Sequence, residues 1–190
     1  MKVVQTSVLV LAALVTGVLA TKPVIGFMVD RAAIHNGPWR TNIGTGRSDG
    51  GLYVSAAVAV AGLYALAKEE TIYFAAFTDS QGQKLTGGCQ YLLTGSAPAS
   101  RWWSLTMYGA DHYLVANPGN IYSRHAGNLM FESDGSYRLQ IAAEAMPGNW
   151  LPSPPKGAFS ITLRLYNPAP TVYQNLSHIA LPDIHRESCT

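Results

Sequence analysis

The chain has 190 residues, a formal net charge of +2 and only 13% charged residues. This length suits one domain together with a targeting or anchoring segment. The arginines are scattered along the sequence, whereas a nucleic-acid-binding protein needs a concentrated basic surface to displace counterions. The composition therefore argues against nucleic acid as a partner.

The first 30 residues predict a membrane helix or a signal peptide, with residues 31–190 forming one domain. Lys2 is followed by a nearly unbroken apolar stretch, residues 3–20. As a signal peptide, this stretch would be cleaved after the small residue Ala20. As an anchor, 18 helical residues span about 27 Å, just short of a hydrocarbon core of about 30 Å, and apolar residues resume after Pro23. We favour the anchor, which places the protein in the inner membrane; cleavage would leave it soluble in the periplasm. Lys2 orients the body toward the periplasm in either case.

A loop and one helix are expected before the strands begin. Residues 36–51 are rich in glycine and predict a loop, in which Trp39 is expected to pack against the core. Residues 52–67 are rich in alanine and predict an accessory helix. Because this helix lacks a polar face, we expect it to be buried. The alternative is a re-entrant helix or one that lies in a membrane interface.

From about residue 71 onward, alternation of apolar and polar residues predicts β-strands. The clearest examples are residues 102–108 and 159–166, and the Asp134-Gly135 pair predicts a hairpin. About seven such strands with short turns favour an all-β sandwich or barrel, packed on one face of each sheet and wetter on the other. The apolar residues of the two clearest strands are Trp103, Leu105, Met107, Phe159, Ile161, Leu163 and Leu165.

The two cysteines, Cys89 and Cys189, both lie in the part of the chain that would be exported. Two cysteines in an oxidising compartment are candidates for one disulfide. Such a bond would also hold a C-terminal tail that otherwise carries few apolar anchors. The alternative is two unpaired thiols, one buried and one on the tail.

Four segments resemble a bacterial family called domain of unknown function 1214. They are NGPWRTN at 36–42, RWWSLTMYGAD at 101–111, the Asp-Gly pair at 134–135, and GNWLPSPPKGAFSITLRLY at 148–166. The chain looks like a short, membrane-anchored member that lacks the second uncharacterised domain of larger ones. The resemblance implies a jelly-roll-like β-sandwich with one accessory helix and implies no activity. His112 stands where this turn more usually carries glycine, which indicates a turn residue rather than a ligand.

Catalytic and metal-binding patterns are weak in this sequence. None of the five histidines pairs with another ligand at the spacing of a recognised metal motif, so no metal or other cofactor is predicted. Cys89 has no evident partner base, and a Gly-x-Ser-x-Gly nucleophile motif is absent from the sequence. Glu144, beside a Met-Pro-Gly loop, is the one carboxylate retained as a candidate.

The best candidate binding residues are Asn149, Trp150 and Arg164, with Tyr108 and Glu144. Trp150 follows Asn149 beside a proline-rich loop, where an indole could stack on a sugar or another flat ligand. Arg164 occupies the polar face of an otherwise apolar strand. If that face is covered, its charge needs a partner or an anionic ligand. In the structural alternative, Trp150 caps one end of the sandwich and Arg164 ties loops together through backbone carbonyls.

These residues favour a non-catalytic binding or interaction module of the cell envelope, facing the periplasm. Its partners would be the membrane, through the N-terminal helix, and a saccharide, a lipid or another protein. Two alternatives remain open at the sequence level. One is a hydrolase-type enzyme with a cleft at one end of the sandwich, and the other is a structural envelope component.

We predict that the N-terminal helix is retained in the mature protein. A C-terminally tagged form should migrate at the same size on an immunoblot with and without inhibition of signal peptidase. A band that shortens by the length of the first 20 residues, and does so only when the peptidase is active, would establish a cleaved signal peptide instead.

Overall fold

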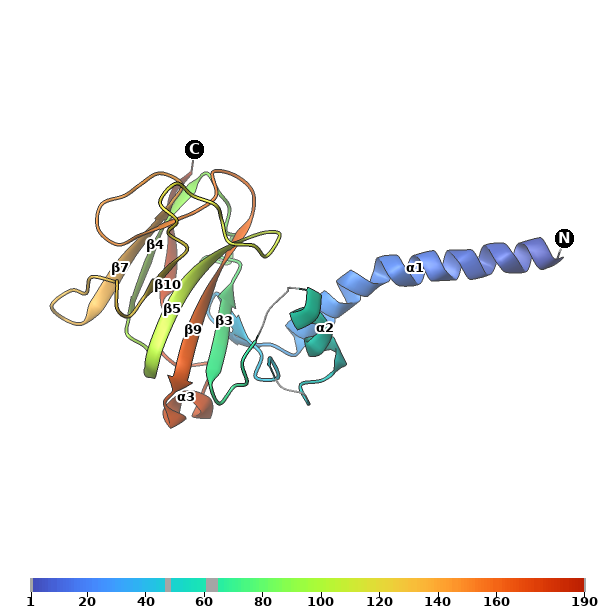
Figure 1. Ribbon diagram of the computed structural model, residues 1–190, viewed down its shortest axis with the longest axis horizontal. Helices are drawn as coiled ribbons and strands as arrows, with labels where there is room; N and C mark the ends of the chain where they lie inside the picture. The colour runs from blue at the N-terminus through green and yellow to red at the C-terminus, as the bar shows by residue number, and fades with distance from the viewer. Residues whose placement is uncertain (1, 47–48, 61–64, 190) are drawn as a thin grey trace.

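The computed structural model describes residues 2–46, 49–60 and 65–189. Two β-sheets pack face to face, and one long helix projects from this sandwich (Figure 1). One sheet has six strands in the order β1-β2-β3-β9-β5-β6, and the other has four in the order β10-β4-β7-β8. The predicted class, an all-β sandwich with an accessory helix and an N-terminal apolar helix, is confirmed.

The strands of the six-stranded sheet are β1 (Ile34–Asn36), β2 (Trp39–Thr41), β3 (Thr71–Ala76), β9 (Phe159–Pro168), β5 (Ser100–Gly109) and β6 (Ser123–His125). Those of the four-stranded sheet are β10 (Asp183–Cys189), β4 (Cys89–Ser96), β7 (Ser136–Ala142) and β8 (Trp150–Pro152). The helices are α1 (Lys2–Arg31), α2 (Leu52–Val60) and α3 (Pro170–Gln174). Strands β7 and β8 pair in parallel, and the other pairings of named strands are antiparallel.

The core lies between the two sheets and follows the alternation seen in the sequence. The predicted apolar faces of β5 and β9 point into it, and Leu105 and Leu163 have no exposed surface. Across the interface, Tyr137 of β7 stacks on Trp103 of β5 with ring centroids 5.2 Å apart. Trp39 is also buried, as expected, and its indole N–H donates to the carbonyl of Pro182 at 2.6 Å.

Helix α1 is long and apolar enough to cross a membrane, judged by length and composition. It leaves the body as a rod, and none of its most apolar window is buried against the rest of the protein (Figure 1). Only near its C-terminal end does it meet the body, where Ile25 and Val29 are half-buried. These residues are four apart and therefore share one face of the helix.

The accessory helix is shorter than the predicted range of 52–67. Helix α2 extends from Leu52 to Val60, residues 61–64 lie outside the described part, and residues 65–67 are not helical. The Leu66 N–H donates to the Tyr73 hydroxyl at 2.8 Å, a tertiary contact in place of a helical hydrogen bond. The expected full burial is wrong for most of α2, because Val54 is its one buried residue.

Two further expectations need correction. The glycine-rich loop at 36–51 begins with strand: β1 and β2 form a hairpin that extends the sheet next to β3, so strands begin before residue 71. Three-residue strands are too short to show a period of two in the sequence. The Asp134-Gly135 pair does form a turn, with Gly135 at φ 82°. It leads into β7 from an irregular segment, however, so it does not join two strands.

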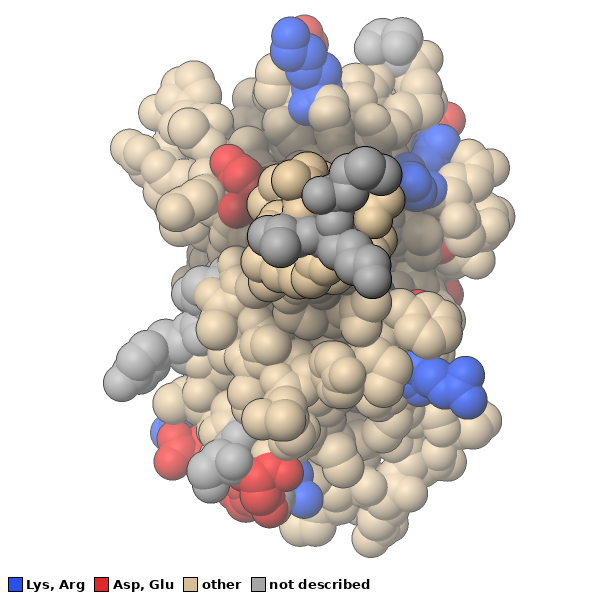
Figure 2. Space-filling view, turned by 90° about the vertical axis from the view of Figure 1, so that its right-hand side faces the viewer, with Lys and Arg blue, Asp and Glu red and all other residues tan. Residues whose placement is uncertain are grey.

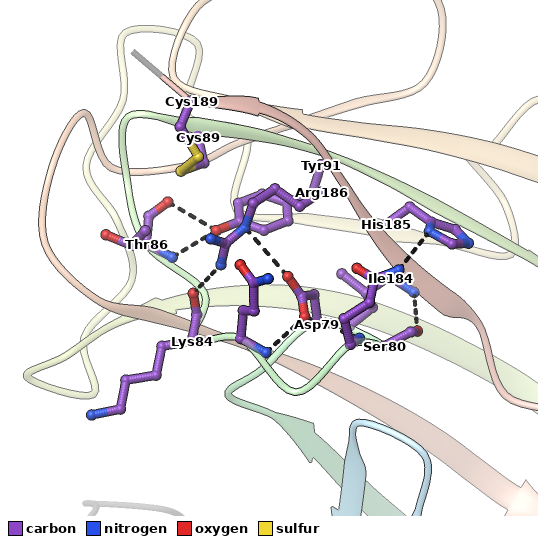
Figure 3. Close-up of polar contacts among 12 residues, drawn as sticks. Asp79, Ser80, Lys84, Thr86, Cys89, Tyr91, Ile184, His185, Arg186 and Cys189 are labelled. Carbon is purple, nitrogen blue, oxygen red and sulfur yellow. Dashed lines mark hydrogen bonds and ion pairs between the residues drawn. A yellow bond between two sulfur atoms is a disulfide. The ribbon is translucent and has the colours of Figure 1, made fainter.

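The C-terminal strand is held to the body by a covalent bond and an ion pair (Figure 3). Cys89 and Cys189 lie directly opposite each other in the β4–β10 pairing and form the predicted disulfide. Beside it, the Arg186 guanidinium lies 3.3 Å from the buried carboxylate of Asp79 and 5.4 Å from the centre of the Tyr91 ring. These contacts fix a strand that forms one edge of its sheet.

Loss of the disulfide should destabilise the protein by about 2–4 kcal/mol, because the bond closes a loop with a sequence separation of 100 residues. Denaturant unfolding of the Cys89→Ala/Cys189→Ala variant measures this change in the free energy of unfolding. Wild-type protein unfolded in reductant should match the variant, whereas equal stability of oxidised wild type and variant would contradict the prediction.

Tyr137 should make stability fall at high pH. Burial raises the pKa of its hydroxyl above the ordinary value of 10.0. Since the unfolded chain loses this proton first, stability is unaffected below pH 10 and declines as pH rises above it. Within the described residues the hydroxyl has no hydrogen-bond partner. Tyr137→Phe should therefore keep stability at pH 7, or raise it by about 1 kcal/mol, and show a weaker decline in alkaline unfolding titrations.

Candidate functional site

A cavity of about 350 Å³ lies between the six-stranded sheet and helices α1 and α2. Its floor is the sheet face that points away from the sandwich core, formed by β3, β9 and β5. Its walls come from the C-terminal part of α1 and from α2. Among the lining residues are Tyr73, Tyr108, Thr162 and Arg164 from the sheet, and Ile25, Val29, Val54 and Val58 from the helices.

Arg164 reaches this floor because of the strand alternation. In β9 it stands between Leu163 and Leu165, which are both fully buried in the core, so its side chain projects from the opposite face. Its neighbours across the sheet are Tyr73 of β3 and Ser104 of β5. The sequence condition that the polar face be covered is met in part, since helices lie over this part of the sheet and Arg164 is half-buried.

The guanidinium of Arg164 is oriented by two hydroxyl groups. Its Nη1 donates to Thr106 Oγ1 at 2.9 Å and its Nη2 donates to Tyr108 Oη at 2.6 Å. Its central carbon also lies 5.8 Å from the centre of the Tyr73 ring and 5.5 Å from that of Tyr108. Among the described residues, no carboxylate forms an ion pair with it. The group is thus held in place by neutral partners, and no described carboxylate lies within ion-pair distance to offset its charge.

The remaining charges of the cavity do not neutralise Arg164. Asp30 at the end of α1 pairs with Arg40 of β2 at 2.5 Å, and the Arg40 guanidinium lies 4.1 Å from the centre of the Phe77 ring. Lys22 also lines the cavity. The described lining therefore carries three basic side chains and one acidic side chain, and its other walls are mainly aliphatic.

His112 lines the cavity from a turn after β5. Its φ of 67° lies in the left-handed region, where glycine is favoured, in keeping with its expected role as a turn residue. The Asp111 carboxylate accepts a hydrogen bond from the Tyr113 N–H at 3.1 Å. Across the described residues, no group of three or more His, Cys, Asp or Glu side chains is arranged to hold a metal ion.

Of the five candidate residues, the structure brings together Arg164 and Tyr108. Asn149 instead bridges loops: its side chain donates to the carbonyls of Met130 and Arg138, and accepts from the Met130 N–H at 2.8 Å. Glu144 is exposed in the loop between β7 and β8. Neither of these two residues lines the cavity.

Trp150 lies in β8, on the four-stranded sheet, whereas Arg164 lies on the six-stranded one. The Trp150 indole N–H donates to the Ala142 carbonyl at 3.0 Å, and its own carbonyl accepts from Arg124 Nε at 2.7 Å. These contacts join β8 to its neighbour and to β6. Trp150 does not line the cavity.

Sequence reasoning missed the helical half of the cavity. Ile25 and Val29 share a helix face, a spacing visible in the sequence, but it is hidden within a segment that is apolar on all sides. Tyr73 was also missed, although it pairs with Arg164 across β3 and β9. The alternation in β3 could have indicated that Tyr73 points away from the core, as Arg164 does in β9. Alternation alone does not show, however, that β3 pairs with β9.

Comparison with known proteins identifies the family. The sequence profile of the family described as "protein of unknown function (DUF1214)" matches residues 70–170, which include β3, β5, β9 and the sheet residues around Arg164. The chain belongs to the DUF1214 family. Its match covers the cavity floor and leaves out α1 and α2. No curated protein matches the chain.

Solved structures similar to this DUF1214 protein include the following two. The VPA0106 protein from Vibrio parahaemolyticus is 29% identical with a TM-score of 0.60, over 72% of this chain and 35% of that one. A putative uncharacterized protein from Burkholderia cenocepacia is 19% identical with a TM-score of 0.46, over 64% of this chain and 30% of that one. This chain thus spans about a third of the length of either protein.

Proposed function

We propose that this protein is a membrane-anchored, non-catalytic binding module whose cavity takes an anionic group attached to a short apolar chain. The observation that carries the proposal is Arg164: a half-buried guanidinium, oriented by the Thr106 and Tyr108 hydroxyls, with no described carboxylate paired to it. A charge in such a place costs free energy unless a counter-charge joins it. An anionic ligand would supply that counter-charge.

The chemistry of arginine narrows the ligand class. A guanidinium has five N–H donors in one plane, and it binds carboxylate or phosphate oxygens in pairs. Two of its donors are engaged by Thr106 and Tyr108, and others remain for a ligand. The two hydroxyls act as positioning groups, because they hold the plane of the guanidinium before a ligand arrives.

The walls of the cavity favour an apolar chain next to the anion. The helices contribute Ile25, Val29, Val54 and Val58, while the sheet supplies the polar floor. At about 350 Å³, the cavity lies at the lower end of the range of roughly 300–1,000 Å³ that small-molecule sites occupy. A carboxylate or phosphate with a short hydrocarbon tail matches both the guanidinium on the floor and the aliphatic side chains of the walls.

The proposed location is the outer face of the inner membrane, with the body in the periplasm. Helix α1 supports anchoring through its length and composition. The Cys89–Cys189 disulfide supports an oxidising compartment, since such bonds persist there and are rare in the cytosol.

The full-length protein in nanodiscs should bind laurate more tightly than dodecanol, which lacks the charge, or acetate, which lacks the chain. Arg164→Gln should weaken laurate binding about 10- to 100-fold, the equivalent of a charged hydrogen bond of about 1.5–3 kcal/mol. It should leave dodecanol binding nearly unchanged. Isothermal titration, with empty nanodiscs as blank, measures both affinities.

Arg138→Gln is the matched control, because it makes the same chemical change at an exposed position of β7 in the other sheet. Partition of laurate into the bilayer is the same for all variants and cancels in the comparison. Equal laurate affinity in wild type, Arg164→Gln and Arg138→Gln would overturn the role of Arg164. Laurate binding no tighter than that of acetate would overturn the ligand class.

A further inference from the structure

Apolar side chains gather on the surface where α1 meets the body. In α2, Leu52 is 88% exposed and Tyr53 is 45% exposed. In α1, Phe27 is 65% exposed, and Val24 is exposed beside it. Helix α2 has no charged residue. We call these four residues, none of which lines the cavity, the apolar platform; an exposed group of this kind marks a surface that a membrane or another molecule covers.

We infer that the apolar platform rests in the headgroup region of the same lipid bilayer that α1 crosses. This inference depends on the anchoring part of the proposed function and is independent of the cavity ligand. The sequence left an interface-lying helix as the alternative to a buried one. The exposure of α2 favours that alternative.

The length of α1 places the platform at the right depth. Its 30 residues extend about 45 Å, whereas a hydrocarbon core of about 30 Å takes about 20 residues. A core that begins at Val4 therefore ends near Pro23. The following residues of α1, with Val24 and Phe27, lie at the level of the headgroups, and Lys22 can extend its ammonium group to the same level.

Helix α2 lies alongside this part of α1. The two helices contact each other, and both contribute valine or isoleucine side chains to the cavity lining, namely Ile25, Val29, Val54 and Val58. A nine-residue helix extends about 14 Å and is too short to span a bilayer, so an apolar helix at this depth lies along the surface. Tyr53 suits this position, since its ring is apolar and its hydroxyl can reach water.

The charge distribution agrees with a membrane-facing surface. Figure 2 views the protein along α1 toward the body, which is the direction from the bilayer. Lys, Arg, Asp and Glu side chains lie on the left and right of the end-on helix and at the top and bottom of this face, and mainly uncharged atoms cover the area directly below the helix. A bilayer would cover this uncharged area and leave the charged side chains in contact with headgroups and water.

The test attaches the environment-sensitive fluorophore NBD to single introduced cysteines in the full-length protein. Both native cysteines are in the disulfide, so an introduced thiol is the one that reacts. Leu52→Cys reports on the platform, Leu14→Cys on the middle of α1, and Ser133→Cys on an exposed turn before β7. The proteins are placed in nanodiscs of phosphatidylethanolamine and phosphatidylglycerol, with or without nitroxide-labelled lipids.

We expect NBD at position 52 to emit at shorter wavelength than at position 133 and to be quenched by nitroxides near the headgroups. NBD at position 14 should be quenched by nitroxides deep in the acyl chains. Water-like, unquenched emission at 52 with quenching at 14 would overturn the platform and leave the anchor intact. Unquenched emission at 14, or loss of the labelled segment by cleavage, would overturn the anchor and the platform together. The outcomes of this labelling experiment do not test laurate binding, which the titration measures separately.

Discussion

Strand β9 is fully covered on one face and partly covered on the other, and the rest of the molecule is arranged around that constraint. One face contributes Leu163 and Leu165 to the core between the sheets. The other carries Thr162 and Arg164 under the helices α1 and α2. A half-polar strand face normally meets water. Here helices take the place of water over part of it, and they leave a cavity whose floor holds a guanidinium oriented by neighbouring hydroxyls. The proposed site is therefore a consequence of how the helices meet the sheet, rather than of a loop or a recognised motif.

The same arrangement connects the cavity with the proposed membrane surface. Helices α1 and α2 line the cavity with one side, through Ile25, Val29, Val54 and Val58, and expose apolar residues on the other. With the platform in the headgroup region, the cavity would lie directly beside the lipid phase. An anion with a hydrocarbon chain is the type of molecule that a bilayer supplies. The disulfide and the Asp79–Arg186 ion pair act elsewhere, since they hold β10 at the edge of the four-stranded sheet.

Much of the fold could be predicted because its strongest signals are local. Alternation in β5 and β9 identified the buried residues, such as Leu105 and Leu163, with the correct faces. The pairing of Cys89 with Cys189 was predicted from their number and from the expected export of the body, and the structure contains this disulfide. Short elements were missed, because three residues of β2 show no period. The end of α2 was placed too late, because Leu66 takes a tertiary hydrogen bond to Tyr73 that composition does not reveal.

The sequence by itself determined the β-strand character of the body, the apolar N-terminal helix, the two cysteines that were candidates for a disulfide, and the side of β9 on which Arg164 projects. Each follows from a period, a composition or a cysteine count. Only the tertiary structure decided that Arg164 meets Thr106, Tyr108 and Tyr73 under two helices, while Asn149 and Trp150 bond to backbone in other places. These contacts join residues up to about a hundred positions apart. They depend on which strands pair and where α1 and α2 pack, and a local pattern contains neither.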